Sequence, residues 1–153
     1  HDIGNVINRA DHAQSGAVMA FRILDKMGAE ADETSTIISA IGNHDEMTAY
    51  PVNDVAAALI LADKTDVRRT RVRNKADKST FDIHDRVNFA VESATCQLND
   101  THTTLTLQLK LDTDICPVME YFEIFLDRML LCRKAAEKLA IKFELYINSQ
   151  KIM

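Results

Sequence analysis

The stretch Thr104–Leu111, TLTLQLKL, decides the fold class of this chain. Its four leucines alternate with polar side chains, and a period of two predicts a half-buried strand. Before about Ser79, by contrast, the apolar residues recur at helical spacing. This change of period predicts an α+β protein, with an all-helical domain over residues 1–78 and a small α/β domain over residues 79–153. The polar stretch Asn74–Thr80 marks the expected boundary.

The α/β domain is predicted to contain three strands and one helix. Residues 87–91 alternate like the leucine stretch, and Asn99–Asp100 is a plausible turn, so the two strands are expected to form a hairpin. From Cys116 to about Leu139 the apolar residues recur at helical spacing, and residues 142–147 alternate again. The order strand, strand, helix, strand predicts a small sheet with one helix packed on its apolar face.

The helical domain is predicted to begin inside a helix. Residues 1–8 have the pattern of a helix that is already under way, because no N-cap precedes them. Asp11 can cap a second helix that runs to Met27, where Gly28 is a natural stop.

Two further helices are predicted before the boundary. The third begins at Asp32 or Thr34 and ends near Gly42. After a loop, Asn53 can cap the fourth helix, whose run VAAALILA is apolar on every side. We therefore expect this helix to be buried centrally, with Asp63 at the end of the run.

Composition excludes several classes of protein. The formal net charge of −5 argues against a general nucleic-acid binder. No apolar run approaches the roughly 20 residues that are needed to span a bilayer. Cys96, Cys116 and Cys132 are odd in number, widely spaced and set in apolar stretches, so we interpret them as reduced core thiols of a cytoplasmic protein.

Charge is unevenly distributed along the chain. Residues 63–78 hold seven basic and three acidic side chains, a net charge of +4, which leaves −9 for the rest. Such a local basic cluster predicts a small anionic ligand such as a phosphate. A solvated basic helix end explains the same cluster equally well.

Five side chains of the helical domain form a candidate metal-ligand set. His1 and Asp2 open the chain in the string HDIGN. His12 lies just inside the second predicted helix, His44 near the end of the third, and Asp63 on the fourth. Successive helices thus offer ligands to one shared centre, as in the metal sites of helical bundles. Imidazole and carboxylate groups together suit divalent Zn, Mn or Fe.

A simpler interpretation of the same residues stays open. The histidines can be scattered, and Asp63, a carboxylate that needs a partner if it is buried, can pair with Arg68 or Arg69. Asp66, one helical turn after Asp63, can orient a ligand or a water. It can equally pair with Arg69 at a spacing of three residues.

Four strings in the first 75 residues resemble, in order, the motifs of the HD-domain metal-dependent phosphohydrolase superfamily: HDIGN, RADHAQSGA, AIGNHDE and LILADKTDVRRTR. By this resemblance, His1 and Asp2 correspond to the HD pair of the family, and Asp63 corresponds to its last aspartate. His12 and His44 match the two additional histidine ligands of the two-metal members. The resemblance implies that the first domain has the HD-type helical fold.

The chain departs from the family pattern in two places. The first histidine of the family precedes the HD pair, whereas this sequence opens at the pair. We therefore expect that the N-terminal part of the domain is missing or that the site lacks one ligand. The residue after HDIG is often lysine in the family and is Asn5 here. A cation for the substrate phosphate is then expected from Lys64, Arg68 or Arg69.

The resemblance implies a metal-dependent phosphohydrolase that acts on a nucleotide or another small phosphate ester through a metal-activated water. The expected cofactor is one or two divalent ions, of Mn, Fe, Mg or Zn. The expected catalytic residues are Asp2, Lys64, Asp66 and Arg69. The alternative is a catalytically silent HD-fold module that binds metal or nucleotide for regulation or dimerisation. Independently of these two functions, an exposed part of the apolar stripe on the 116–139 helix is expected to form a homodimer interface.

Overall fold

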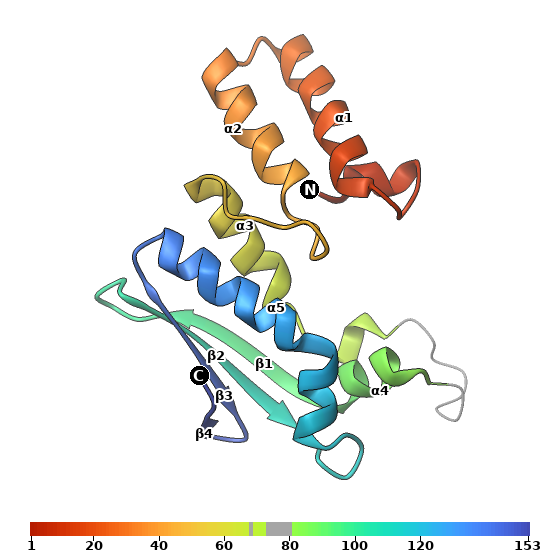
Figure 1. Ribbon diagram of the computed structural model, residues 1–153, viewed down its shortest axis with the longest axis vertical. Helices are drawn as coiled ribbons and strands as arrows, with labels where there is room; N and C mark the ends of the chain where they lie inside the picture. The colour runs from red at the N-terminus through yellow and green to blue at the C-terminus, as the bar shows by residue number, and fades with distance from the viewer. Residues whose placement is uncertain (68, 73–80) are drawn as a thin grey trace.

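The structure, a computed structural model, describes residues 1–67, 69–72 and 81–153 (Figure 1). Within these ranges the chain forms five α-helices and a four-stranded mixed sheet, which confirms the α+β class. Arg68 and the predicted boundary in Asn74–Thr80 lie outside the described residues. In chain order, the elements are η1 (Asp2–Val6), α1 (His12–Met27), α2 (Ala31–Gly42), α3 (Asp54–Lys64), η2 (Arg69–Arg71), α4 (Ile83–Ala90), β1 (Val91–Leu98), β2 (Thr104–Leu111), α5 (Val118–Lys138), β3 (Lys142–Ile147) and β4 (Gln150–Lys151).

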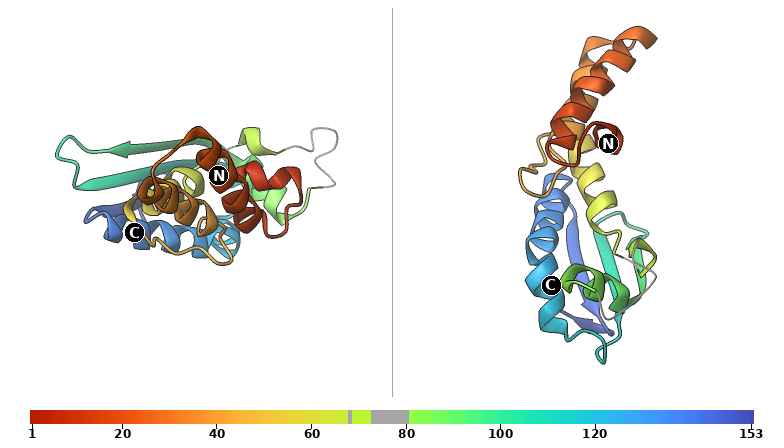
Figure 2. Two further views of the ribbon diagram at one scale, coloured as in Figure 1. Left: turned by 90° about the horizontal axis from the view of Figure 1, so that it is seen from above. Right: turned by 90° about the vertical axis from the view of Figure 1, so that its right-hand side faces the viewer.

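The sheet is built around the leucine stretch, which forms β2. β1 and β2 make the predicted antiparallel hairpin, and β2 and β3 run parallel, with Leu107 beside Leu145. Parallel neighbours need a crossover connection, and α5 supplies it across one face of the sheet (Figures 1 and 2). Leu107 and Leu145 are fully buried on that face. The predicted turn at Asn99–Asp100, the helix and the final strand are therefore confirmed, whereas the first strand of the hairpin is β1 rather than residues 87–91. The short β4 extends the sheet beyond β3.

The strand predicted over residues 87–91 is wrong, because α4 occupies all but the last of these positions. Asp82 begins α4, since its carboxylate accepts a hydrogen bond of 2.7 Å from the backbone N–H of Asp85. Val87 and Ala90, three residues apart, are the buried side chains of the helix. A short helix with a local cap thus replaces the first part of the expected strand.

α3 shares its hydrophobic core with the sheet. One cluster of buried side chains joins α3 to α5, β2 and β3, and includes Ile60, Leu61, Phe125, Leu107 and Leu145. The expectation that α3 is buried on every side is wrong, because Val55, Ala58 and Ala62 are exposed. One face of α3 packs on the second half of the chain, and the opposite face meets solvent.

Two predicted helix signals are confirmed. Gly28 follows α1 in the left-handed region, at φ 73°, where a residue without Cβ is favoured. Asn53 caps α3, because its side-chain oxygen accepts a hydrogen bond of 2.7 Å from the backbone N–H of Ala56. α3 therefore begins at a fixed point, and that point sets where its last turn delivers Asp63.

Three other predictions about the helices are wrong in detail. Residues 1–8 do not form an α-helix, because only Asp2–Val6 are helical and they form the 3-10 helix η1. Asp11 precedes α1 but makes no side-chain cap. Its backbone is left-handed at φ 54°, which aspartate tolerates better than most residues do. α2 begins at Ala31, before either predicted start.

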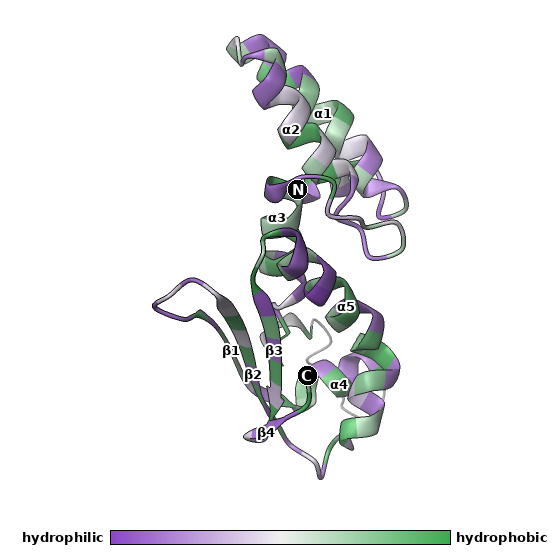
Figure 3. Cartoon of the chain, turned by 60° about the vertical axis from the view of Figure 1, so that its left-hand side comes forward, coloured by the Kyte–Doolittle hydropathy of each residue, from purple (hydrophilic) through white to green (hydrophobic). Residues whose placement is uncertain are grey.

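α1 and α2 form an antiparallel pair that projects away from the sheet (Figures 1 and 2). Hydrophobic residues line part of the outside of this pair (Figure 3), and Val18 and Met27 are 70% and 75% exposed. None of the helices in the described ranges combines the length and apolar content that crossing a bilayer requires.

The cysteines follow the core-thiol expectation in two of three positions. Cys116 and Cys132 are buried, whereas Cys96 on β1 is exposed, and all three are free thiols. Burial raises the pKa of the Cys132 thiol to about 12, so this side chain stays protonated at neutral pH.

Candidate metal centre

Two glycines let the start of the chain lie directly against α1. A Cβ atom on Gly4 would lie 2.0 Å from the backbone oxygen of His12, and one on Gly16 would lie 3.3 Å from the backbone oxygen of His1. Glycine is required at Gly4, because no side chain fits between the two backbones. This close approach of η1 to α1 brings His1 and Asp2 beside His12.

His12 and His44 are oriented by backbone carbonyl groups. Nδ1 of His12 lies 3.0 Å from the backbone oxygen of Arg9, and Nδ1 of His44 lies 2.6 Å from that of Ile41. A carbonyl oxygen only accepts hydrogen bonds, so each Nδ1 must carry the proton and donate it. In the neutral rings, each Nε2 then presents a lone pair. This pattern is typical of metal-binding histidines, whose second nitrogen commonly donates to a carbonyl.

The two Nε2 atoms converge with a carboxylate oxygen. Nε2 of His12 lies 3.1 Å from Nε2 of His44, and both rings are almost fully buried. Oδ1 of Asp2 lies 3.4 Å from the first and 3.7 Å from the second. Two atoms that each sit about 2.1 Å from one ion are separated by about 3.0 to 3.4 Å in octahedral or tetrahedral coordination. Two of the three separations lie in this range, and the third, between His44 and Asp2, exceeds it by 0.3 Å.

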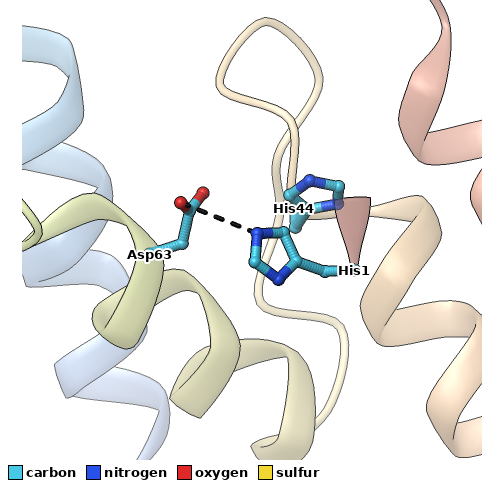
Figure 4. Close-up of side chains that lie close together, drawn as sticks. All are labelled: His1, His44 and Asp63. Atoms are coloured by element: carbon cyan, nitrogen blue, oxygen red, sulfur yellow. Dashed lines mark ion pairs between the residues drawn. The ribbon is translucent and has the colours of Figure 1, made fainter. Parts of the chain in front are cut away.

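A second group of three potential ligands adjoins the first. Nε2 of His1 lies 3.8 Å from Oδ1 of Asp63, across the gap between η1 and α3 (Figure 4). His44 completes this group, and its ring meets that of His1 edge to face at a centroid distance of 4.9 Å. The donor atoms within each group lie within 4.8 Å of one another. The fold thus brings together all five residues that the sequence analysis names as candidate metal ligands.

Lys64 holds the carboxylate of Asp63. Its Nζ donates to Oδ2 of Asp63 at 2.6 Å, and the Lys64 side chain is only 8% exposed. Oδ1 of the same carboxylate is the atom closest to His1. Lys64 is therefore placed to orient a ligand, a different use from the phosphate contact that the sequence predicts.

Four of the five candidate ligands, all except His1, line a small polar cavity with a volume of about 60 Å³. Four carboxylates and three cationic side chains give the lining a formal charge of −1 with neutral histidines. The lining residues are Asp2, Arg9, His12, His44, Asp45, Glu46, Asp63, Lys64 and Arg128.

An ion pair across this cavity joins the two halves of the chain. Nε and Nη2 of Arg128, on α5, donate to one carboxylate oxygen of Glu46 at 3.0 and 2.9 Å. The guanidinium also lies over the ring of Phe125, 4.6 Å from its centroid. The sequence analysis missed both members of the pair. The available signal was a charged residue inside the apolar stripe of α5, next to the buried Met129.

Two predicted site residues lie away from the cavity. Asp66 lines a different surface cavity, together with Thr65 and Cys96. Arg69 donates from Nε to the backbone oxygen of Phe89 at 2.6 Å, and its guanidinium lies over the Phe89 ring. Arg68 lies outside the described residues.

The arrangement is thus a five-residue cluster of histidine and aspartate with an adjoining arginine. Its nitrogen and oxygen donors are suited to a divalent transition metal. No protein-family model, no curated protein and no solved structure gives a significant match to this chain.

Proposed function

We propose that this protein is an HD-type metal-dependent phosphohydrolase that acts on a nucleotide or another small phosphate ester. One observation carries the proposal. The Nε2 atoms of His12 and His44 lie 3.1 Å apart, with Oδ1 of Asp2 close to both. Each of these three atoms offers a lone pair, and the two histidines are buried, so the convergence becomes favourable when a cation lies among the three atoms.

The five ligand candidates fit a divalent ion of borderline softness. Imidazole nitrogen suits Zn, Mn and Fe, and carboxylate oxygen extends the choice to Mg. The ligands would be His1, Asp2, His12, His44 and Asp63. When bound, such an ion supplies an acidified water and positive charge for the oxygens of a phosphoryl group.

The side chains around the ligands fix their orientation. The backbone oxygens of Arg9 and Ile41 hold the rings of His12 and His44 with Nε2 turned toward the cavity. Lys64 leaves Oδ1 of Asp63 directed toward His1. A site that is organised before its ligand arrives spends little free energy on rearrangement, which favours catalysis as well as binding.

The second candidate is a module that binds metal or nucleotide without turnover. The observation that favours it is the small volume of the cavity, about 60 Å³. Asp66 and Arg69, expected to take part in catalysis, also lie outside the lining of that cavity. A regulatory or dimerisation role would need the five candidate metal ligands but no catalytic residues.

Metal content and turnover measured on the same samples separate the two candidates. The purified chain would be loaded with Mn, Fe, Zn or Mg and analysed for bound metal by mass spectrometry. The same samples would be assayed on an aryl phosphomonoester, an aryl phosphodiester and a series of nucleotides. The chain offers a matched control, because His84 and Asp85 form another His-Asp pair, on α4 and outside the cavity.

The proposal expects near-stoichiometric metal and turnover in the wild type and in H84A and D85A. H12A and D2A are expected to lose both. Stoichiometric metal without turnover on any substrate would support the binding module instead. A chain that takes up no metal would rule out the hydrolase and the metal-binding module.

A further inference from the structure

We infer that Arg128 of α5 binds the phosphate group of the ligand at the cavity, an inference that rests on the proposed function. Eight of the nine side chains that line the cavity precede residue 81, and Arg128 is the ninth. It reaches the cavity from the crossover helix that covers the sheet (Figure 1). The second half of the chain therefore contributes a side chain to the site.

The guanidinium of Arg128 is held in a fixed plane. Oε2 of Glu46 accepts from both Nε and Nη2, which occupies one edge of the fork. The ring of Phe125 supports the guanidinium at 4.6 Å. A guanidinium carries five N–H donors, so the edge formed by Nη1 and Nη2 remains for a second acceptor. Two parallel N–H groups on that edge match two oxygens of a phosphate.

The other two cations of the cavity are less suited to this task. Nζ of Lys64 donates a hydrogen bond of 2.6 Å to the carboxylate of Asp63, which is itself a candidate metal ligand. The side chain of Arg9 is 75% exposed, so solvent screens its charge. Arg128 is 22% exposed and already oriented. Electrostatic attraction is stronger where less water screens it, and the loss of side-chain freedom on binding is smaller for a fixed group.

The charge of the lining makes phosphate binding depend on metal. With neutral histidines the nine lining residues carry a formal charge of −1, which does not attract an anion. One divalent ion changes this value to +1 and makes the cavity attractive to phosphate. Arg128 then supplies a directional contact on the side of the cavity that faces α5.

The experiment measures binding of inorganic phosphate by calorimetry to the full chain, with and without Mn²⁺. The variants are R128Q, R128K and E46Q. R133Q is the matched control, because Arg133 lies on the same helix, pairs with Glu137 and lies outside the cavity. Circular dichroism and thermal melting establish that each variant is folded. R128K, which keeps the charge, serves if R128Q does not fold.

We expect phosphate binding by the wild type only in the presence of Mn²⁺. R128Q loses a charge-assisted pair of hydrogen bonds, so its affinity for phosphate in Mn²⁺ is expected to fall by about 10- to 100-fold. R128K is expected to be intermediate, because an ammonium group lacks the planar fork. R133Q is expected to match the wild type. E46Q is expected to bind at least as tightly as the wild type, since it removes a negative charge and keeps Arg128.

Three results would overturn the inference. They are an R128Q variant that binds phosphate like the wild type, an E46Q variant that loses as much affinity as R128Q, and a wild type that binds no phosphate with Mn²⁺. The second would mean that only the ion pair matters, as a structural link. Turnover with an unchanged KM in R128Q would refute this inference and leave the proposed function standing. Phosphate binding that depends on Arg128, without turnover on any substrate, would support this inference and refute the proposed hydrolase function.

Discussion

The Nε2 atoms of His12 and His44 lie 3.1 Å apart, and Nδ1 of each ring faces a backbone carbonyl oxygen. Two neutral imidazoles in this arrangement direct their lone pairs at each other. In that protonation state the two lone pairs repel each other, and a cation bound between them converts the repulsion into an attraction. Binding to the native state alone stabilises that state, so metal is expected to raise the free energy of unfolding.

The first prediction concerns thermal stability in Mn²⁺ and in a chelator. At 100 times its Kd, an ion that binds only the folded chain adds about 2.7 kcal/mol of stability. For a chain of this size, this gain corresponds to a Tm higher by about 5 to 10 °C. Differential scanning fluorimetry measures the shift. H12A should abolish this shift in Tm, and H84A should keep it. A wild-type Tm that does not respond to Mn²⁺ would contradict the prediction that a cation binds the folded chain beside His12 and His44.

The second prediction tests the contact between η1 and α1. G4A places a Cβ 2.0 Å from the backbone oxygen of His12, which forces η1 away from α1 and moves Asp2. Overpacking of this kind costs about 1 to 3 kcal/mol of stability. We expect the variant to lose affinity for Mn²⁺ as well. Chemical denaturation and metal titration provide the two readouts.

G28A is the control for this glycine. Gly28 has a left-handed backbone, and a Cβ there meets nothing within 4 Å. The substitution should cost about 1 to 2 kcal/mol through backbone strain alone. Mn²⁺ affinity should stay at the wild-type level, because α1 ends far from the cavity. Equal loss of affinity in the two variants would show that general destabilisation, rather than the position of η1, is responsible.

The third prediction tests the core that α3 shares with the sheet. Ile60 is fully buried, and I60A should cost about 2 to 5 kcal/mol. Val55, on the same helix, is 46% exposed, so V55A should change stability by about 0.5 kcal/mol or less. Urea unfolding followed by circular dichroism should show one transition that shifts as a whole in I60A. A second transition whose midpoint is unchanged in I60A would mean that the helical half and the sheet half of the chain unfold independently.

The fourth prediction concerns alkaline pH. Burial raises the pKa of Cys132 from 9.0 to about 12, so the folded state keeps a proton that the unfolded chain releases. The stability from this group is therefore complete below pH 9 and is lost as the pH rises from 9 toward 12. The difference in unfolding free energy between the wild type and C132A should shrink over this window, by up to about 1.4 kcal/mol per pH unit. A difference that is constant from pH 8 to 11 would contradict the assignment.

The parts of the fold that the sequence predicts well depend on local chemistry. The alternating leucines of Thr104–Leu111 identify β2, because a period of two suits only a strand with one buried face. Gly28 and Asn53 mark the ends of helices through backbone conformation and capping, which need no distant contact. The five candidate metal ligands also come from sequence, and the fold gathers them within one cluster. Their role as ligands stays a prediction.

The parts that the sequence does not predict depend on long-range contacts, or on two local signals that favour different secondary structures. Residues 87–91 carry an alternation that fits a strand, but the cap from Asp82 favours a helix over residues 83–90. Glu46 and Arg128 lie 82 residues apart, and only the packing of α5 brings them together. Arg69 was expected at a phosphate and instead contacts Phe89, because η2 lies beside α4 rather than at the cavity.

His44 belongs to both groups of three potential ligands, and this sharing limits how many ions the centre can hold. Its Nδ1 is engaged by the backbone oxygen of Ile41, so a single lone pair, on Nε2, serves both groups. One lone pair coordinates one ion at a time. Two ions would therefore compete for His44, and the second would bind with negative cooperativity. If the centre binds two ions, only one of them can be coordinated by His44, and the other must rely on the remaining ligands of its group.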